Sequence, residues 1–159
     1  MLDLIDPGGD EVTVDGGWGV DALLGGQTRE HGDLDLAVPA HGLDRIVRTL
    51  RRAGFERYPR SDDTEFMFVM AAGAIDVDLH AFAFASDEQV ASVGVAYPRA
   101  ALTGHGAILG RPVRCIAADG VIRFHSGYEP DDDDLADVRA VAQAFDLPLL
   151  PEHRRSTKG

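Results

Sequence analysis

GGWGVDALLGGQTREHGDLDLAV, from Gly16 to Val38, is the stretch of sequence on which the fold depends. The β-branched run Val12–Val14 comes just before it and predicts a short strand that stops at the glycine pair. The segment Trp18–Leu24 has helical character and ends at a second glycine pair. The stretch therefore begins as strand, glycine turn and helix, with Trp18 expected on the apolar, core-facing side of that helix.

An acidic strand follows at residues 33–38. Leu34, Leu36 and Val38 alternate with Asp33 and Asp35, so one face of the strand is apolar and the other is acidic. Residues 75–84 repeat this arrangement further along the chain. That segment predicts a strand with Asp76, Asp78 and His80 on one face.

Two acidic strand faces in one small domain favour a cation between them. Closely placed carboxylates repel each other, whereas two Mg²⁺ ions about 3.5 to 4 Å apart need such a cluster of hard oxygen ligands. We therefore expect a divalent metal site. The alternative, two acidic faces that simply point into water, remains open.

The glycine pair Gly16-Gly17 lies where a ligand can approach the backbone closely, and the following helix offers amide groups to phosphate oxygens. Arg29 lies between this pair and the acidic strand, and a guanidinium binds phosphate in a bidentate manner. The pattern predicts one site for phosphate, metal and carboxylates. A plain tight turn at the glycines is the alternative.

Length and composition narrow the function further. The 159 residues, 45% hydrophobic and 26% charged, predict one α/β or α+β domain over residues 1–159. Inside the hydrophobic middle, the longest stretch without a charged residue, 66–75, is about half the roughly 20 residues of a membrane span. The N-terminus MLDLIDPGGDE is acidic where a secretory signal carries Lys or Arg, which predicts a cytoplasmic protein. The lone Cys115 argues against redox chemistry.

The charge balance bears on partners. A formal net charge of −12 repels a phosphate backbone, so cationic or neutral small molecules are expected rather than nucleic acid or a membrane. The alternative is a composition typical of GC-rich coding, because 14 of the 15 basic residues are Arg. The remaining periodicities predict an amphipathic helix over 42–53 and strands at 55–58, 66–70 and 113–116. A further helix is expected from Asp119, which would cap it, to about Ser126. The final helix is expected to start at Asp132–Asp134, and the tail after about residue 148 is expected to fray.

Residues 16–38 as a whole resemble the opening of the small antibiotic nucleotidyltransferases, the lincosamide and aminoglycoside adenylyltransferases of the polymerase-beta-like superfamily. Three later motifs resemble the lincosamide branch: VDLHAF (77–82), GRPVRC (110–115) and FHSGYEP (124–130). The resemblance implies an α+β fold with a mixed sheet flanked by helices. It shows no residue-by-residue match over Tyr58–Ala74, and the chain before the first strand is shorter than is usual in the family.

The resemblance also implies the reaction, in which a hydroxyl of a small acceptor takes a nucleoside monophosphate from a triphosphate and pyrophosphate leaves. Asp33, Asp35 and Asp78 occupy the places of the catalytic, metal-binding carboxylates for two Mg²⁺ ions. Gly16, Gly17 and Arg29 would hold the triphosphate, with ATP as the expected co-substrate.

The sequence leaves some roles and functions open. Asp76, His31 and His80 are candidates for supporting roles in the site, and His125 and Tyr128 enter only through the resemblance. A homodimer is one open arrangement of the chain. A metal-dependent phosphohydrolase with the same carboxylates and a catalytically silent nucleotide-binding protein are the alternative functions.

Overall fold

The structure is a computed structural model that describes residues 12–154. The acidic N-terminal stretch on which the cytoplasmic prediction rests lies outside the described residues. Among the described helices, none is both long and apolar enough to cross a bilayer.

An eight-stranded mixed sheet forms the centre of the molecule, with the order β3-β4-β5-β2-β1-β8-β7 and with β6 paired to β5. The strands are β1 (Thr13–Val14), β2 (Asp33–Pro39), β3 (Glu56–Tyr58), β4 (Met67–Ala72), β5 (Ile75–Ala83), β6 (Val93–Gly94), β7 (Gly104–Ile108) and β8 (Arg111–Cys115). The predicted strands at 12–14, 34–38, 55–58, 66–70, 75–84 and 113–116 correspond to β1, β2, β3, β4, β5 and β8.

Two pairings in this sheet are parallel, β2 with β5 and β1 with β8, and the others are antiparallel. The β2–β5 pair is in register along the whole of β2, from Asp33 opposite Asp76 to Pro39 opposite Phe82. This register sets the acidic residues of the two strands side by side.

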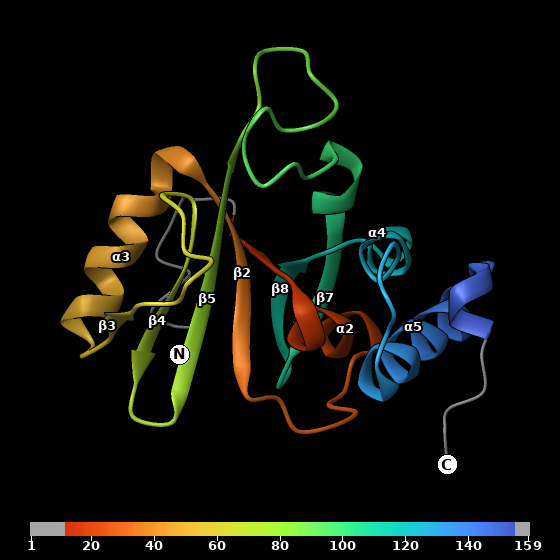
Figure 1. The fold of residues 1–159 in the computed structure, drawn as a ribbon. Helices are drawn as coiled ribbons and strands as arrows, with labels where there is room; N and C mark the ends of the chain where they lie inside the picture. The colour runs from red at the N-terminus through yellow and green to blue at the C-terminus, as the bar shows by residue number, and fades with distance from the viewer. Residues whose placement is uncertain (1–11, 155–159) are drawn as a thin grey trace.

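Helices cover the sheet in two groups (Figure 1). The helix α3 lies beside β3, β4 and β5, whereas α2, α4 and α5 gather on the side of β8 and β7. The helical segments are α2 (Gly16–Leu24), α3 (Leu43–Arg52), α4 (Ala118–Phe124), α5 (Asp132–Phe145) and the 3-10 turns Ala40–Gly42, Arg99–Thr103 and Pro151–Arg154. A mixed sheet flanked by helices confirms the predicted fold class.

The amphipathic pattern of α3 anchors it to the sheet. Ile46 and Leu50 are buried with Leu36, Met70 and Leu79 in one core cluster. Arg48, Arg51 and Arg52 of α3 are exposed. A second cluster packs α2, α4 and α5 together, with Val20, Ile116, Val121 and Val141 among its buried members. The two clusters leave the acidic face of β2 and β5 between the helix groups.

The structure differs from the sequence analysis at the start of α4, at β7 and after residue 148. The N-cap of α4 is Ala117 with no side-chain hydrogen bond, and Asp119 instead lies in the first turn. The strand β7, GHGAI, was not predicted because its two glycines disfavour a strand; antiparallel pairing with β8 outweighs that preference. The tail after residue 148 was predicted to fray, but Pro151–Arg154 forms a 3-10 turn whose His153 is fully buried. The His153 ring nitrogen Nε2 donates to the carbonyl of His125 at 2.6 Å, which holds this turn in place.

Candidate active site

The acidic faces of β2 and β5 form the centre of the candidate site. Because the strands are parallel and in register, Asp35 lies opposite Asp78 and Asp33 opposite Asp76, while the alternate residues such as Leu36 are buried in the core. Ligand atoms of Asp35, Asp78 and His80 all lie within 4.8 Å of one another. The exposed Asp33 lies outside this close group, nearer the start of β2.

The glycine pair lies directly beside this cluster. It occupies the first turn of α2 rather than a turn before the helix, and Asp15 is the N-cap, accepting a hydrogen bond from the Gly16 amide at 2.8 Å. Gly16 has a φ of +57°, and a Cβ there would overlap the Asp35 carboxylate. A Cβ at Gly17 would overlap His31 and lie 2.9 Å from Arg29 Nη2. Both glycines are therefore needed for side chains to approach the start of α2.

Electrostatic repulsion is concentrated at Asp35. The pKa of this carboxyl is raised to about 7, most strongly by burial and then by the charges of Asp33, Asp15 and Asp78, while the charge of His80 opposes the rise. Ionisation of Asp35 is thus unfavourable in the folded chain, as its raised pKa shows. Such a site gains from any ion that compensates the carboxylates.

A hydrogen-bonded chain joins the two sides of the cluster. The Tyr97 hydroxyl donates to Asp15 Oδ2 at 2.6 Å and lies 3.2 Å from His80 Nδ1, and His80 Nε2 lies 3.4 Å from Asp78 Oδ1. Burial lowers the pKa of His80, but the hydrogen bond and charge of Asp78, with the charges of Asp35 and Asp15, raise it overall. His80 is held as a partner of Asp78.

Asp15 and Tyr97 were missed by sequence reasoning. Asp15 carries a detectable signal, because an Asp immediately before a helical segment is a favoured N-cap. Tyr97 carries none, because it reaches the site from a loop that is 82 residues further along the chain.

The predicted phosphate ligand Arg29 is held by an acidic residue of α5. Its Nη2 lies 2.8 Å from Asp137 Oδ2, and Nη1 lies 3.7 Å from Asp133. The hydrogen bond with Asp137 raises the pKa of Arg29, which keeps it charged. The Asp137 side chain is buried, and the pair positions the guanidinium beside Gly17.

His31 is held in a similar way from the helix. Its Nε2 lies 2.5 Å from Asp21 Oδ2, and the other Asp21 oxygen accepts hydrogen bonds from the amide and hydroxyl of Thr28. The His31 ring stacks at a tilt on Trp18, with centroids 4.8 Å apart. The carboxylate that His31 contacts is thus Asp21, not one of the predicted metal ligands.

The segment 58–74 also contributes to the site. Arg60, in the loop between β3 and β4, lies 3.5 Å from Asp78 Oδ2 and 3.8 Å from Asp76 Oδ2. His125 and Tyr128, by contrast, both contact Asp134 of α5, at 3.5 and 3.1 Å. These two residues tie the end of α4 to α5 and do not belong to the carboxylate cluster.

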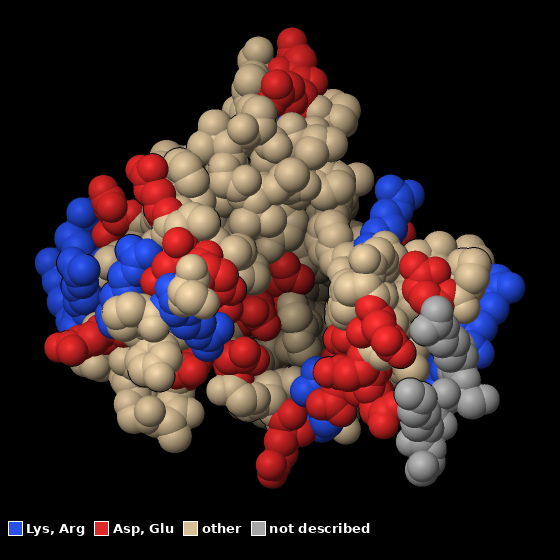
Figure 2. Space-filling model, viewed as in Figure 1, with Lys and Arg blue, Asp and Glu red and all other residues tan. Residues whose placement is uncertain are grey.

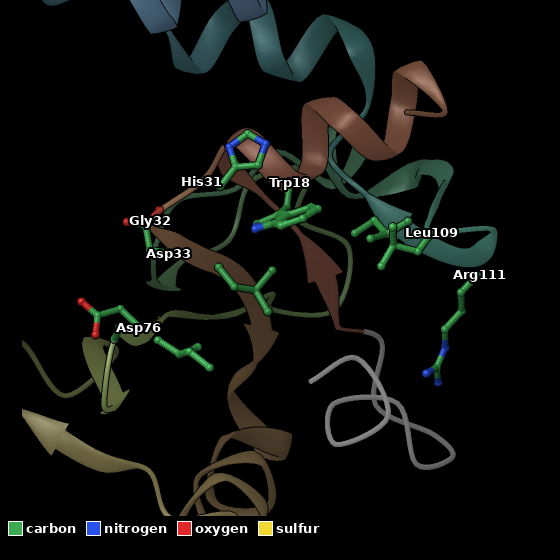
Figure 3. A pocket seen from close by; sticks show the side chains of 11 residues that line it. Trp18, His31, Gly32, Asp33, Asp76, Leu109 and Arg111 are labelled. Carbon is green, nitrogen blue, oxygen red and sulfur yellow. The ribbon is translucent and has the colours of Figure 1, made fainter. Parts of the chain in front are cut away.

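A pocket of about 590 Å³ opens next to the acidic cluster. Asp33 and Asp76 stand on one side of it, and Trp18, Leu109 and Arg111 lie around the other (Figure 3). Trp18 therefore packs against the core, as predicted, and also lines the pocket. Figure 2 shows acidic side chains gathered in the hollow between the α3 side of the molecule and the α4–α5 side.

Comparison with known proteins gives the same family at the level of sequence. Residues 1–141 match the family model described as aminoglycoside-2''-adenylyltransferase. A lincosamide resistance protein from Staphylococcus haemolyticus is 38% identical over 56 residues, 35% of this chain and 35% of that protein. A 2''-aminoglycoside nucleotidyltransferase from Klebsiella pneumoniae is 30% identical over 109 residues, 69% of this chain and 59% of that protein. The matched regions thus span about a third of the first relative and about three fifths of the second.

Solved structures share the fold. The chain is similar to ANT(2")-Ia in complex with adenylyl-2"-tobramycin, with a TM-score of 0.73 and 20% identity over 90% of this chain and 84% of that one. It is also similar to the lincomycin-bound lincosamide antibiotic adenylyltransferase LnuA, with a TM-score of 0.67 and 23% identity over 82% of this chain and 84% of that one. The family model covers nearly all of the chain and the resemblance seen in the sequence is confirmed, so the protein belongs to the aminoglycoside-2''-adenylyltransferase family.

Proposed function

We propose that the protein is a Mg²⁺-dependent nucleotidyltransferase that moves AMP from ATP to a hydroxyl of a small cationic acceptor such as a lincosamide or an aminoglycoside, with release of pyrophosphate. One observation carries the proposal: the in-register β2–β5 pair sets Asp35 and Asp78 side by side, directly against the glycine pair that begins α2. Family membership supports the same reaction.

The donor atoms suit a divalent cation. Asp35 and Asp78 present converging carboxylate oxygens, and burial, followed by the charges of neighbouring aspartates, raises the pKa of Asp35. Asp33, Asp35 and Asp78 would hold two Mg²⁺ ions, with Asp33 completing the set from the exposed start of β2. Bound Mg²⁺ supplies charge neutralisation of the triphosphate and of the attacking oxygen.

The chain's own residues then bind, orient and accept a proton. The acceptor hydroxyl oxygen forms a bond to the α-phosphorus as the bond to the bridging oxygen of the β-phosphate breaks, and pyrophosphate leaves. Asp78 accepts the hydroxyl proton on a carboxylate oxygen, and His80 keeps that carboxylate oriented at 3.4 Å.

The triphosphate belongs at the N-terminus of α2. Gly16 and Gly17 carry no side chains of their own, so other groups can approach the backbone closely, as Asp35 and His31 do, and the helix N-terminus favours anions. Arg29 stands beside Gly17 with its orientation set by Asp137, so a charged donor is available for phosphate oxygens.

The acceptor is proposed from charge and from the pocket. Asp76 offers negative charge to an ammonium group, while Trp18, Ile75 and Leu109 offer an apolar wall to a ring. Two relatives are named for aminoglycoside and lincosamide antibiotics, which are hydroxyl-bearing cations. A small cationic acceptor fits this pocket better than an anionic polymer does.

The test is a screen of lincosamides and aminoglycosides with ATP and Mg²⁺, read by mass spectrometry for an added AMP. Pyrophosphate release that requires the acceptor supports transfer. Release of phosphate or pyrophosphate without any acceptor would show a phosphohydrolase instead, and nucleotide binding with no turnover under any condition would show a silent binding protein. The Asp78→Asn variant, which loses a proposed metal ligand and proton acceptor, serves as the inactive control.

A further inference from the structure

The Arg60 guanidinium bridges the two acidic residues of β5. Its Nη1 lies 3.5 Å from Asp78 Oδ2 and its Nη2 lies 3.8 Å from Asp76 Oδ2. Arg60 is carried by the loop between β3 and β4, with its side chain 39% exposed, whereas the Asp78 side chain is only 18% exposed. A partly exposed cation on the rim thus reaches a carboxylate inside the cluster.

The contacts are longer than the 2.7–2.9 Å typical of a charge-assisted hydrogen bond, so the attraction is mainly Coulombic. A partly exposed ion pair of this kind contributes little to folding and exchanges easily. The other arginine at the site differs, because Arg29 is fixed by a 2.8 Å contact to the buried Asp137. Arg60 is therefore placed to neutralise the cluster without being locked to it.

We propose that Arg60 is an internal counter-ion that competes with divalent cations for Asp78 and so sets the affinity of the metal site. The inference rests on the proposed role of Asp78 as a metal ligand. In the absence of metal, Arg60 offsets the repulsion between Asp76 and Asp78. A divalent ion on Asp78 repels the guanidinium and weakens the ion pair, so metal binding includes the work of displacing Arg60.

The experiment measures Mn²⁺ binding to the full chain without nucleotide or acceptor, by electron paramagnetic resonance of the unbound ion. Arg60→Gln removes the charge and is expected to lower the Kd for Mn²⁺ by about three- to tenfold, the effect of one charge acting on a divalent ion a few ångströms away in a screened, water-rich site. Arg60→Lys keeps the charge and should stay much closer to the wild-type Kd.

The matched control is Arg52→Gln, which makes the same change in net charge at an exposed position in the last turn of α3. Its Kd should remain at the wild-type value, and thermal unfolding should show that all three variants are folded. An unchanged or raised Kd in Arg60→Gln, or an equal fall in Arg52→Gln, overturns the proposal.

A separate assay distinguishes this inference from the proposed function. If the wild-type chain binds Mn²⁺ and Arg60→Gln tightens that binding, the counter-ion role stands even when no acceptor is adenylylated. If Arg60→Gln leaves Mn²⁺ binding unchanged but raises the KM for ATP, Arg60 is a phosphate ligand and the counter-ion role is wrong. Failure of the wild-type chain to bind Mn²⁺ refutes both the inference and the two-metal mechanism.

Discussion

The Asp35 carboxylate is placed where ionisation is unfavourable, next to Gly16 and among three other aspartates. We expect Asp35→Asn to abolish nucleotidyl transfer, because a metal-binding oxygen is lost. The same change should raise the free energy of unfolding by about 1–2 kcal/mol at pH 8 in the presence of a chelator, because a buried, repelled charge is removed. Denaturant unfolding and the AMP-transfer assay measure the two effects.

The sign of the pH dependence follows from the direction of the Asp35 shift. The pKa of this carboxyl rises from 3.8 to about 7 on folding, so the folded chain binds more protons than the unfolded chain between these values. The wild-type protein therefore loses stability as pH rises through that window, and the gain from Asp35→Asn should be larger at pH 8 than at pH 5. The exposed Asp87→Asn serves as control; an equal gain at both pH values, or retained activity, contradicts the prediction.

The Arg29–Asp137 pair has two separable roles, one in stability and one in nucleotide binding. Arg29→Ala should raise the KM for ATP by about 10- to 100-fold, the effect of losing a charge-assisted contact worth about 1.5–3 kcal/mol. It also leaves the buried Asp137 carboxylate unpaired, which should lower the free energy of unfolding.

The double variant Arg29→Ala/Asp137→Ala distinguishes these roles. Removing both partners should restore part of the stability but none of the ATP affinity, because only the guanidinium is proposed to meet the phosphates. Thermal unfolding and ATP titration give both readouts. A single Arg29→Ala variant with the wild-type KM for ATP would assign Arg29 to a structural role alone.

The segment between β6 and the 3-10 turn Arg99–Thr103 reaches the site through one side chain. Tyr97 packs between Phe82 and Phe124, each with ring centroids 5.6 Å away, and its hydroxyl joins Asp15 to His80. Burial is the largest cause that raises the pKa of Tyr97, so the hydroxyl remains a donor throughout the working pH range.

Tyr97→Phe keeps the ring packing and removes only this hydroxyl. We expect a loss of about 1–2 kcal/mol in the free energy of unfolding, because the Asp15 carboxylate loses a buried donor. We also expect a lower kcat with little change in the KM for ATP, because His80 loses a fixed partner. Tyr128→Phe, at a half-exposed position that bonds only to Asp134, should change stability by less than about 0.5 kcal/mol. Equal effects in the two variants would show that the Tyr97 hydroxyl has no positioning role.

The net charge of −12 acts on the whole molecule, and acidic side chains gather in the hollow that holds the site (Figure 2). Such a field should draw in a cationic acceptor, so the acceptor KM should rise several-fold between 0.1 M and 1 M salt, as the Debye length falls from about 10 Å to about 3 Å. An N-acetylated acceptor without the ammonium charge is the control and should show a flatter response. A salt-independent KM for the cationic acceptor would refute the electrostatic attraction.

Much of the local architecture was predictable because it depends on neighbours in the chain. The alternation in β2 and β5, the apolar stripe of α3 and the acidic start of α5 follow from strand and helix periods and from capping, which act over a few residues. The same local chemistry predicted one candidate site at the glycine pair and the two acidic strand faces, and the resemblance to the family singled out Asp33, Asp35 and Asp78 among the aspartates. The sequence by itself therefore determined which strand faces are acidic and where a glycine pair begins a helix.

Only the tertiary structure decided which of these groups meet. The parallel register of β2 and β5, the contact from Tyr97 to Asp15, the pair of Arg29 with Asp137, and the reach of Arg60 to β5 all join segments distant in the chain. Such contacts depend on how the core clusters pack the elements together, and no local period encodes that packing. Burial and neighbouring charge, which raise the pKa of Asp35, arise from the same packing and become visible only in the folded chain.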